Sequence, residues 1–510
     1  MAPPDAAALL ATERYVTPLP RGGTIGHAAV VYPHGYPVGM SSLALHLLWR
    51  ELAAAGWATD RAFLDPHPGY SLARSRPLRD FDLLAVTCSY ELDYLHLPRL
   101  LEAGGVPALR AERGPKHPLV IAGGPAVTAN PEPLAPFFDL IFIGELEPIW
   151  PELSAALALA PQSRSAALEA AATVPGVYLP GDPPTAPVRR QVLRAVDDHP
   201  CSSVLVTPEA ELSDIFLVET GRGCPQTCRF CLARQLYHPF RPRSLAGLLE
   251  TIRPGLAVTP KIGLLGAALS DHPHLLALVE TLRAEGAQVS TSSLRVGALT
   301  PPLVEALAAT GTRSLTLAPE TGSEALRETL GKPIANRVLL EAATTAQAAG
   351  LHALKLYFMF GLPEETEEDL AAIGELIAQV RSAAPRLRLE VALSPLVPKP
   401  HTPWENLPLL PTAELRARGS RLRRSLERQG LSANVGSSRW TLVQTALSRG
   451  GQELAPAILA ASRAGGDFAA VRRGWREAGL RLEDYAEASS PPPWRVVDLQ
   501  PCPRERAPKA

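Results

Sequence analysis

Short apolar runs that alternate with helical patterns constrain the fold of this chain more than any other feature. A first series of such runs lies at 27–32, 58–63, 82–88, 118–123 and 139–144. A second series lies at 214–220, 261–266, 287–293, 313–319, 352–361 and 386–396. Continuous apolar strands separated by helices are typical of parallel sheets that are covered on both faces. The sequence therefore predicts an α/β protein with two parallel β-structures.

The two series predict two different domains. The first indicates a Rossmann-like parallel sheet over residues 25–160, and the six βα units of the second indicate a partial (β/α)6 barrel of the TIM type over 214–400. Residues 161–213 are rich in Pro, Ala and Arg and carry several turn signals, so we interpret them as a linker. Helical patterns at 412–429, 440–449, 453–463 and 467–478 predict a helical C-terminal region, 401–510, with a Pro-rich tail.

Composition and charge exclude several classes of protein. Apolar residues make up 46% of the 510 residues, and 50 Lys and Arg face 51 Asp and Glu, so the chain has no overall field to attract nucleic acid or an anionic membrane. No run reaches the ~20 apolar residues that a membrane span needs. Six cysteines are too few for a secreted disulfide framework, and the first residues lack the basic region of a signal peptide. We therefore expect a cytoplasmic protein that does not enter membranes.

Three of the six cysteines fall in the loop GRGCPQTCRFC, directly after the first strand of the second series. Cys224, Cys228 and Cys231 form a C-x3-C-x2-C array, and thiolates at such spacing bind an iron–sulfur cluster or a zinc ion. The loop after a barrel strand lies at the face where barrel enzymes carry their active sites. With three ligands, a four-iron cluster keeps one iron open to a small molecule. A zinc ion would need a further ligand, for which His238 is the candidate.

The arrangement strand–GRGCPQTCRFC–helix at the head of six βα units resembles the radical S-adenosylmethionine (SAM) superfamily. Its signature is C-x3-C-x2-C with an aromatic residue before the last cysteine, here Phe230. The resemblance implies a 4Fe–4S cluster held by Cys224, Cys228 and Cys231, whose open iron chelates SAM. It also implies a one-electron donor such as flavodoxin or ferredoxin. Reduction would cleave SAM to a 5′-deoxyadenosyl radical that abstracts a hydrogen atom from the substrate.

The same resemblance points to SAM-binding residues after the later barrel strands. Members of the superfamily carry a Gly-Gly-Glu turn after the second strand, of which only Gly266 remains here, in LLGAALSDHP. In TSSLRVG, Ser292 and Arg295 are candidates for contacts with the ribose hydroxyls and the SAM carboxylate. In APETGSEALRETLGK, Glu320 is a candidate for the ribose, although a capped helix start explains this stretch equally well.

The N-terminal series resembles the cobalamin-binding domain that precedes the barrel in many radical SAM enzymes. GGPAVTANPEPLAPFFDLIFIGELEP resembles its last strands, where a Gly-Gly turn and a Gly-Glu strand end lie against the corrin tail. The hallmark D-x-H-x-x-G is missing. The nearest string, Asp65 to Gly69, follows the second strand, whereas His34 stands on the expected loop without the Asp. Cobalamin would therefore be bound without a protein imidazole, or not at all.

These observations predict an enzyme that cleaves SAM reductively and acts on an unidentified substrate, with methyl transfer as the outcome if cobalamin binds. The alternative is a non-catalytic iron–sulfur sensor, or an RNA-binding protein on the same scaffold. RNA would contact the arginines of the helix at 412–429, which are Arg416, Arg418, Arg421, Arg423, Arg424 and Arg428.

The remaining cysteines lie apart from the array. Cys88 ends an apolar strand and is expected to be a small buried hydrophobic residue. Cys201 and Cys502 are isolated, and the sequence assigns them no role.

Overall fold

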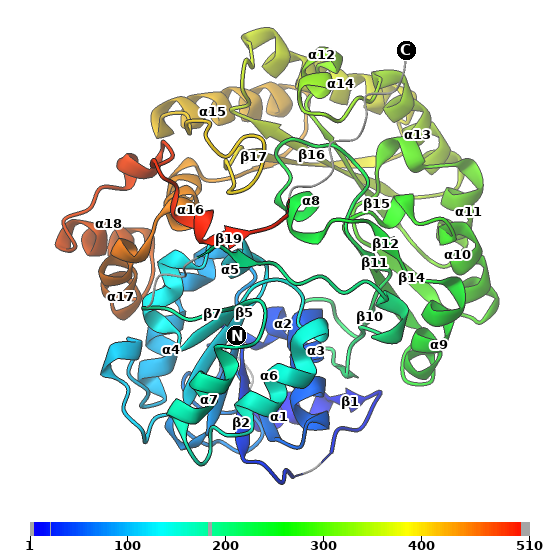
Figure 1. Cartoon of the computed structure of the whole chain (residues 1–510). Helices are drawn as coiled ribbons and strands as arrows, with labels where there is room; N and C mark the ends of the chain where they lie inside the picture. The colour runs from blue at the N-terminus through cyan, green and yellow to red at the C-terminus, as the bar shows by residue number, and fades with distance from the viewer. Residues whose placement is uncertain (1–4, 21, 182–185, 501–510) are drawn as a thin grey trace.

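The first series of apolar runs forms one six-stranded sheet in the computed structural model of the protein, which describes residues 5–20, 22–181 and 186–500 (Figure 1). Its strands are β2 (His27–Val31), β3 (Ala58–Ala62), β4 (Leu83–Thr87), β5 (Leu119–Gly123), β6 (Leu140–Phe142) and β7 (Val177–Tyr178). The first five are parallel, and β7 is antiparallel to β6. The predicted Rossmann-like parallel sheet is confirmed.

Alternate residues of these strands pack into two different cores. Ala28 and Val30 of β2 pack with one set of helices, whereas Ala29 and Val31 pack with another. The helices of this half of the chain are α1 (Ala6–Thr12), α2 (Tyr36–Gly39), α3 (Leu43–Ala54), α4 (Leu97–Ala103), α5 (Pro125–Ala129), α6 (Trp150–Leu157) and α7 (Arg164–Ala171). Because both faces are covered, β4, β5 and β6 are almost entirely apolar, whereas the edge strand β3 carries Thr59, Asp60 and Arg61.

The strand order places a topological switch point between β2 and β4. The sheet runs β3-β2-β4-β5-β6-β7, so the chain leaves β2 toward β3 on one side and returns to β4 on the other. The loops that follow β2 and β4 therefore diverge at the carboxyl edge of the sheet. Open α/β sheets bind their ligands in the crevice between such loops.

The second series of runs forms a curved parallel sheet. Its strands are β10 (Phe216–Glu219), β13 (Lys261–Leu265), β14 (Gln288–Thr291), β15 (Ser314–Glu320), β16 (Ala353–Phe360), β17 (Arg388–Pro395) and β18 (Ala433–Val435). A bridge between Leu294 and Leu317 joins the β10-β13-β14 sheet to the β15-β16-β17-β18 sheet. The six predicted strands are present, and the short strand β18 is an addition that the sequence did not indicate.

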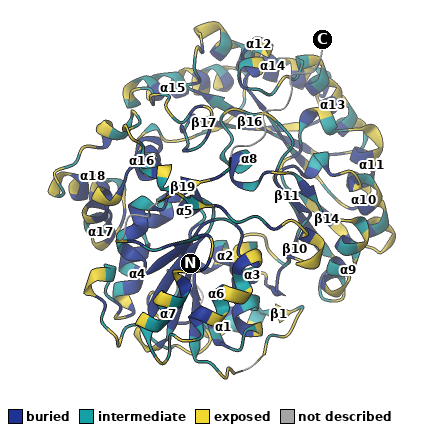
Figure 2. Cartoon of the chain, viewed as in Figure 1, coloured by how far each residue is buried: buried dark blue, intermediate teal, exposed yellow. Residues whose placement is uncertain are grey.

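Helices cover the outer face of this curved sheet (Figure 1). They are α9 (Leu245–Leu256), α10 (Leu275–Ala284), α11 (Pro301–Ala309), α12 (Glu324–Thr329), α13 (Asn336–Ala348) and α14 (Glu367–Ala383). Residues of β16 alternate accordingly: Leu354 and Leu356 are buried in the core, whereas Lys355 and Tyr357 are half-buried on the other face. In Figure 2 the exposed residues of the covering helices lie on their outer sides, away from the sheet. Helix α8 (Leu232–Tyr237) contacts α5 and lies between the two halves of the molecule.

Residues 161–213 are not the linker that we predicted. Helix α7 packs in the N-terminal core and β7 extends the N-terminal sheet. Strand β8 (Val188–Arg189) pairs with β19 (Val497–Asp498), and β9 (Leu205–Val206) pairs with β1 (Arg14–Tyr15). Two-residue strands are too short to show a period, and their partners are far away in sequence. The turn residues were therefore the strongest local pattern in this segment, and nothing in the sequence indicated that β8 pairs with β19 or β9 with β1.

The predicted C-terminal helices are present as α15 (Thr412–Arg428), α16 (Ser438–Arg449), α17 (Ala455–Arg463) and α18 (Phe468–Glu477). They connect the two halves of the molecule. The Asn130 amide donates to the carbonyls of Ser448 (3.1 Å) and Gly450 (2.8 Å), and α17 packs on α4. Lys399, in the loop after β17, forms an ion pair of 2.5 Å with Glu91 of the N-terminal half. No helix in the described ranges is long and apolar enough to cross a bilayer.

His46 of α3 shows how firmly the segment before the barrel is attached. The Val204 amide donates to its Nδ1 at 3.1 Å, and its Nε2 lies 3.0 Å from the Met40 carbonyl. Burial lowers the pKa of His46 from 6.5 to about 4. The unfolded chain therefore takes up a proton here below about pH 6.5, and the folded chain does not.

The expected result is a loss of stability as the pH falls from 6.5 toward 4. His46→Gln removes the titrating group, so its melting temperature should fall less than that of the wild type over this interval. Thermal unfolding at a series of pH values measures the difference. Parallel curves for the two proteins would contradict this assignment.

Candidate active site

The cysteine loop is held between two short strands and a helix. It follows β11 (Gly221–Arg222), which pairs with β12 (Arg241–Pro242), and it ends at α8, for which Cys231 is the N-cap. Gly223 allows the tight path, because its φ is +80° and a Cβ there would lie 2.4 Å from the Pro239 carbonyl oxygen. All three cysteines of the array are free thiols, neither fully buried nor exposed.

A second contact fixes the loop against the turn after α12. The Thr227 hydroxyl donates to the Gly331 carbonyl at 3.1 Å, and the Arg229 amide donates to the Leu330 carbonyl at 2.9 Å. Gly331 has a φ of +71°, and a Cβ on it would lie 2.5 Å from the Thr227 carbonyl oxygen. The cysteine loop is therefore held both by its own strands, β11 and β12, and by the turn after α12, which follows the fourth strand of the barrel.

Three factors set the pKa of the cysteine thiols: their burial, the charges of the neighbouring thiols, and the nearby ion pair between Lys332 and Glu320. The pKa of Cys228 is raised to about 12, mainly by burial; the charge of Lys332 works against this rise, and Cys231 and Glu320 add to it. Lys332 Nζ lies 2.6 Å from Glu320 Oε1 and donates to the Ala318 carbonyl at 2.7 Å. The thiols are protonated in the metal-free chain, so metal binding must release their protons. Lys332 was not among the residues we predicted, because nothing distinguishes it from an ordinary lysine after a helix.

The donor set fits an iron–sulfur cluster better than zinc. Among the residues that the structure describes, no three His, Cys, Asp or Glu side chains are placed to hold one metal ion. His238, the further ligand that zinc would need, is 3.1 Å from Arg190 Nη2, and its Nε2 is 2.7 Å from the Gln500 carbonyl. A zinc ion needs four ligands converging on one point, whereas a four-iron cluster needs three thiolates, each at a separate corner.

Glu320 occupies an unusual backbone position at the end of β15. Its φ of +67° is rare for a residue with a side chain, and such conformations concentrate at functional sites. Burial raises its pKa, and the charge of Lys332 works against this rise. The helix-start interpretation of this stretch applies to Ser323, whose hydroxyl accepts from the Leu326 amide and caps α12. Glu320 takes no part in the cap.

The other predicted residues lie around the same loop. The ring of Phe230 packs against Trp404, with 6.3 Å between centroids. Ser292 Oγ lies 3.4 Å from the carbonyl oxygen of Gly266, so these two candidates are adjacent. Arg295, the candidate for the SAM carboxylate, already forms an ion pair of 2.6 Å with Asp271 through its guanidinium.

Asp271 and Gln226 are further residues that the sequence analysis missed. The Gln226 side chain donates to Asp271 Oδ1 at 2.9 Å and so connects Arg295 to the cysteine loop. Asp271 lies in the string LLGAALSDHP, after the single glycine that matched the superfamily turn. An acidic residue a few positions beyond that turn was the available signal.

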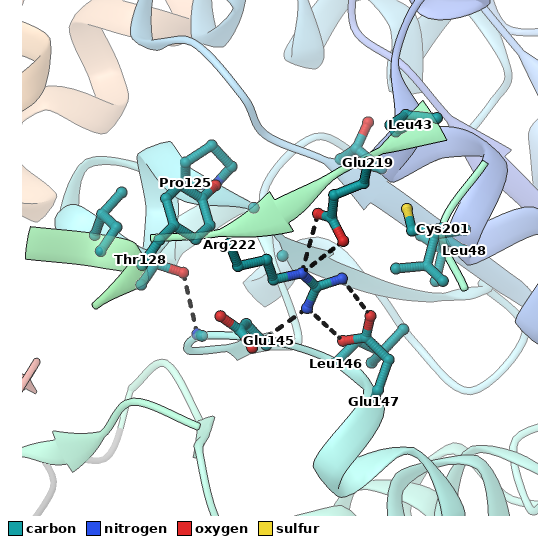
Figure 3. A pocket seen from close by; sticks show the side chains of 18 of the residues that line it. Leu43, Leu48, Pro125, Thr128, Glu145, Leu146, Glu147, Cys201, Glu219 and Arg222 are labelled. Carbon is teal, nitrogen blue, oxygen red and sulfur yellow. Dashed lines mark hydrogen bonds and ion pairs between the residues drawn. The ribbon is translucent and has the colours of Figure 1, made fainter. Parts of the chain in front are cut away.

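A cavity of about 330 Å³ lies between the carboxyl edge of the N-terminal sheet and the start of the barrel (Figure 3). Its walls are mostly apolar. Gly123 at the end of β5, Gly124 after it, Gly144 after β6 and leucines of α3 line one side, and Gly221 to Gly223 line the other. Gly124 has a φ of +123°, and a Cβ on it would lie 2.5 Å from the Cys88 carbonyl oxygen.

Arg222 lies beside this cavity and joins the two halves of the molecule. Its guanidinium contacts Glu147 at 2.6 Å, Glu219 at 3.0 Å and Glu145 at 3.3 Å, and the four side chains converge in Figure 3. Arg241 adds a second bond to Glu145, at 2.7 Å. Glu145 and Glu147 follow β6 of the N-terminal sheet, whereas Arg222 precedes Cys224. The network therefore fixes the cysteine loop relative to the N-terminal domain.

Comparison with known proteins places the chain in a family. The model of the radical SAM superfamily matches residues 218–377, and that of the N-terminal region of radical SAM proteins matches 49–180. An uncharacterized protein of Methanocaldococcus jannaschii is 30% identical over 433 residues, which cover 84% of this chain and 90% of that protein. The chain belongs to the radical SAM superfamily. It is therefore an enzyme, with a 4Fe–4S cluster and SAM as the cofactors that membership implies.

Other relatives of this radical SAM enzyme are more distant. An uncharacterized methyltransferase of Pyrococcus horikoshii is 28% identical over 268 residues, half of this chain and 56% of that protein. The methyltransferase TsrM of Kitasatospora setae, solved with cobalamin and a [4Fe–4S] cluster, superposes with a TM-score of 0.53 at 16% identity and covers 74% of this chain and 76% of its own. This likeness shows the fold. Nothing in the comparisons supports the non-catalytic alternative.

Gly331→Ala is expected to weaken cluster binding while the rest of the fold stays intact. A left-handed alanine costs about 1 kcal/mol at any site, but at Gly331 its Cβ would also push Thr227 and the cysteine loop away. Gly350→Ala is the matched control, because Gly350 has a φ of +82° and open space around its Cβ position. Both variants should melt at similarly lowered temperatures, and only Gly331→Ala should lose iron. Equal iron content in the two variants would show that the contact between Gly331 and Thr227 is not needed to hold the cluster.

Proposed function

We propose that this radical SAM enzyme binds cobalamin on its N-terminal sheet and transfers a methyl group from SAM to an unidentified substrate. The observation that carries the proposal is the apolar cavity at the carboxyl edge of that sheet. Its glycine-lined wall is formed by the Gly-Gly turn and the Gly-Glu strand end, and its volume suits a planar heteroaromatic base. A relative named as a methyltransferase and a fold shared with a cobalamin-bound methyltransferase support it.

The residues of the N-terminal sheet fit cobalamin without a histidine bound to cobalt. His67, in the string nearest to the missing motif, is exposed in the loop that follows the edge strand β3. His34 stands on the expected loop, but its Nδ1 accepts from the Gly35 amide at 2.8 Å, and its ring contacts that of His96 edge-to-face at 5.9 Å. The proposal therefore places the cofactor above the loops after β2 and β4, with its base in the cavity.

Different side chains at the barrel would bind the cluster, lie beside SAM and exclude water. Cys224, Cys228 and Cys231 would bind three irons of the cluster, and Glu320 with Lys332 would lie beside the SAM ribose. When bound, the cluster supplies the electron that breaks a sulfonium bond of SAM, and cobalamin carries the methyl group. Phe230 and Trp404 would exclude water from the barrel mouth, where water would quench a reactive species.

Anaerobic reconstitution of the full chain tests this function. The protein is loaded with iron, sulfide and hydroxocobalamin, then given SAM and a chemical reductant. A bound corrinoid spectrum together with S-adenosylhomocysteine supports methyl transfer. Formation of 5′-deoxyadenosine by a protein that binds no corrinoid would instead indicate radical chemistry without cobalamin. An intact cluster that does not bind SAM would overturn the enzymatic role and support the sensor.

A further inference from the structure

Lys332 lies beside Cys228, at the contact between the cysteine loop and the turn after α12. The hydrogen bonds that Thr227 and Arg229 donate to this turn lie on either side of Cys228. A Cβ on Gly331 would lie 3.6 Å from the Cys228 Cα. Lys332 is the next residue, and consecutive Cα atoms are about 3.8 Å apart. The backbone of Lys332 is therefore fixed close to that of a predicted cluster ligand.

The side chain of Lys332 is turned inward, and 14% of it is exposed. Its Nζ donates to Glu320 Oε1 at 2.6 Å and to the Ala318 carbonyl at 2.7 Å. Both acceptors belong to the last three residues of β15. The carboxyl ends of parallel barrel strands lie at one face, and the cysteine loop lies at the same face because it follows β10. Two hydrogen bonds therefore hold the ammonium at the face of the barrel that carries the cysteines.

The charges of this ion pair act on two of the three cysteines. Burial raises the pKa of Cys228 and of Cys231, the charge of Glu320 adds to the rise, and the charge of Lys332 works against it. For Cys228, the effect of Lys332 is larger than that of Glu320. This agrees with the backbone contact, which places Lys332 beside Cys228.

A cation next to an iron–sulfur cluster favours the reduced state of the cluster. An oxidised four-iron cluster with three thiolate ligands carries a net negative charge, and reduction adds one further electron. The reduction potential of a cluster depends on the charges, the hydrogen bonds and the solvent exposure around it. Because the side chains of Lys332 and Glu320 are largely buried, solvent ions screen their charges little. The positive charge should therefore raise the potential, and the negative charge should lower it.

We propose that Lys332 raises the reduction potential of the cluster and so helps a one-electron donor to reduce it. One electron passes from the donor, which is oxidised, to the cluster, which is reduced, and no bond of the chain forms or breaks. Lys332 also compensates the carboxylate of Glu320, which would otherwise oppose the incoming electron. It acts through its charge and is not a ligand of iron. The inference requires the cluster that superfamily membership implies, and it does not depend on the proposed methyl transfer.

The test is a redox titration of the full chain, reconstituted with iron and sulfide, without SAM or cobalamin. Dithionite and redox mediators set the potential, and electron paramagnetic resonance measures the reduced cluster. Lys332→Met removes the charge at similar length, so the midpoint potential should fall, whereas Lys332→Arg should keep it near the wild-type value. Glu320→Gln should raise it. The double variant Lys332→Met/Glu320→Gln should return toward the wild-type value.

Lys355→Met is the matched control. Lys355 is also half-buried on the inner face of the barrel, where its Nζ lies 5.4 Å from the centroid of the Tyr357 ring. Glu320 is in register with Phe358, so Lys355 lies three residues, or about 10 Å, further from the carboxyl end of the strands. Its replacement should therefore change the midpoint potential much less than Lys332→Met does.

Several outcomes would overturn the inference. One is an unchanged potential in Lys332→Met at wild-type iron content, and another is an equal shift in Lys355→Met. Shifts of the same sign in Lys332→Met and Glu320→Gln would indicate altered water access in place of a charge effect. Loss of iron from Lys332→Met would show that Lys332 holds the loop and does not tune the potential. A wild-type chain that forms no cluster would overturn the metal centre itself, whereas failure to bind cobalamin would count against the proposed function alone.

Discussion

Cys228→Ala is expected to abolish SAM cleavage and to leave the fold intact. Cys228 lies in the loop between β11 and α8 and belongs to none of the hydrophobic clusters, so its side chain supports no packing. With two cysteines remaining, the cluster loses a ligand and the loop cannot hold it in place. Iron content, 5′-deoxyadenosine after reduction, and thermal unfolding measure the three consequences separately. We expect complete loss of the first two and a nearly unchanged melting temperature.

The control for this variant is Cys201→Ala. Cys201 is buried and lies outside the array of three cysteines, in the wall of the cavity beside Arg222, so its replacement should leave the iron content unchanged. Unfolding of Cys228→Ala would contradict the cluster assignment and indicate a metal ion that holds the structure together. Retention of SAM cleavage would show that another residue supplies the third ligand.

Arg222→Met is expected to lower the free energy of unfolding by about 3–5 kcal/mol, since it leaves the buried Glu147 carboxylate without its counter-charge, whereas Glu145 keeps Arg241 and Glu219 keeps Arg243. Glu147 is the most affected, with its side chain 1% exposed. The double variant Arg222→Met/Glu147→Leu should recover part of the loss, because it removes both buried charges together. Urea unfolding of the single and double variants measures the coupling between the two residues.

An exposed pair provides the comparison. Arg253 bonds to Glu285 on the surface at 3.0 Å, and Arg253→Met should cost less than about 1 kcal/mol. A similar small cost for Arg222→Met would contradict the view that the network holds the two domains together.

The loss in Arg222→Met should also depend on pH. Burial acts to raise the pKa of Glu147, but the charge of Arg222 outweighs it, and the net pKa lies below the ordinary 4.5. A lowered pKa stabilises the fold above pH 4.5, and this contribution disappears as the pH falls through the lowered value. The difference between wild type and variant should therefore shrink in acid. A difference that is constant with pH would show that Glu147 is not the residue left unpaired.

The sequence was sufficient where a pattern is local. Both series of strands and the C-terminal helices show a hydrophobic pattern at the period of a strand or a helix, and the array of Cys224, Cys228 and Cys231 is a motif of eight consecutive residues. Glycines that follow strands, such as Gly124, also indicated the edge of the N-terminal sheet at which the cavity lies, because the carboxyl ends of parallel strands lie together.

Features that depend on distant partners could not be predicted. Lys332 is defined by its contact with Glu320, and the role of Arg222 by two glutamates from another domain. Strand β9 exists because residues near the N-terminus pair with it. Such residues have ordinary neighbours in the chain, and their chemistry arises from tertiary structure alone.

The pairing of β8 with β19 has a consequence for folding during translation. Val188 is synthesised early, but its partner Val497 is synthesised only after the whole barrel. Arg190 likewise receives its bond to Asp498 at that late stage. Contacts of such large sequence separation form slowly, and until then an unpaired edge stays open to other nascent chains. The contact between β8 and β19 can therefore form only after the residues of the cysteine loop and of the whole barrel have been synthesised.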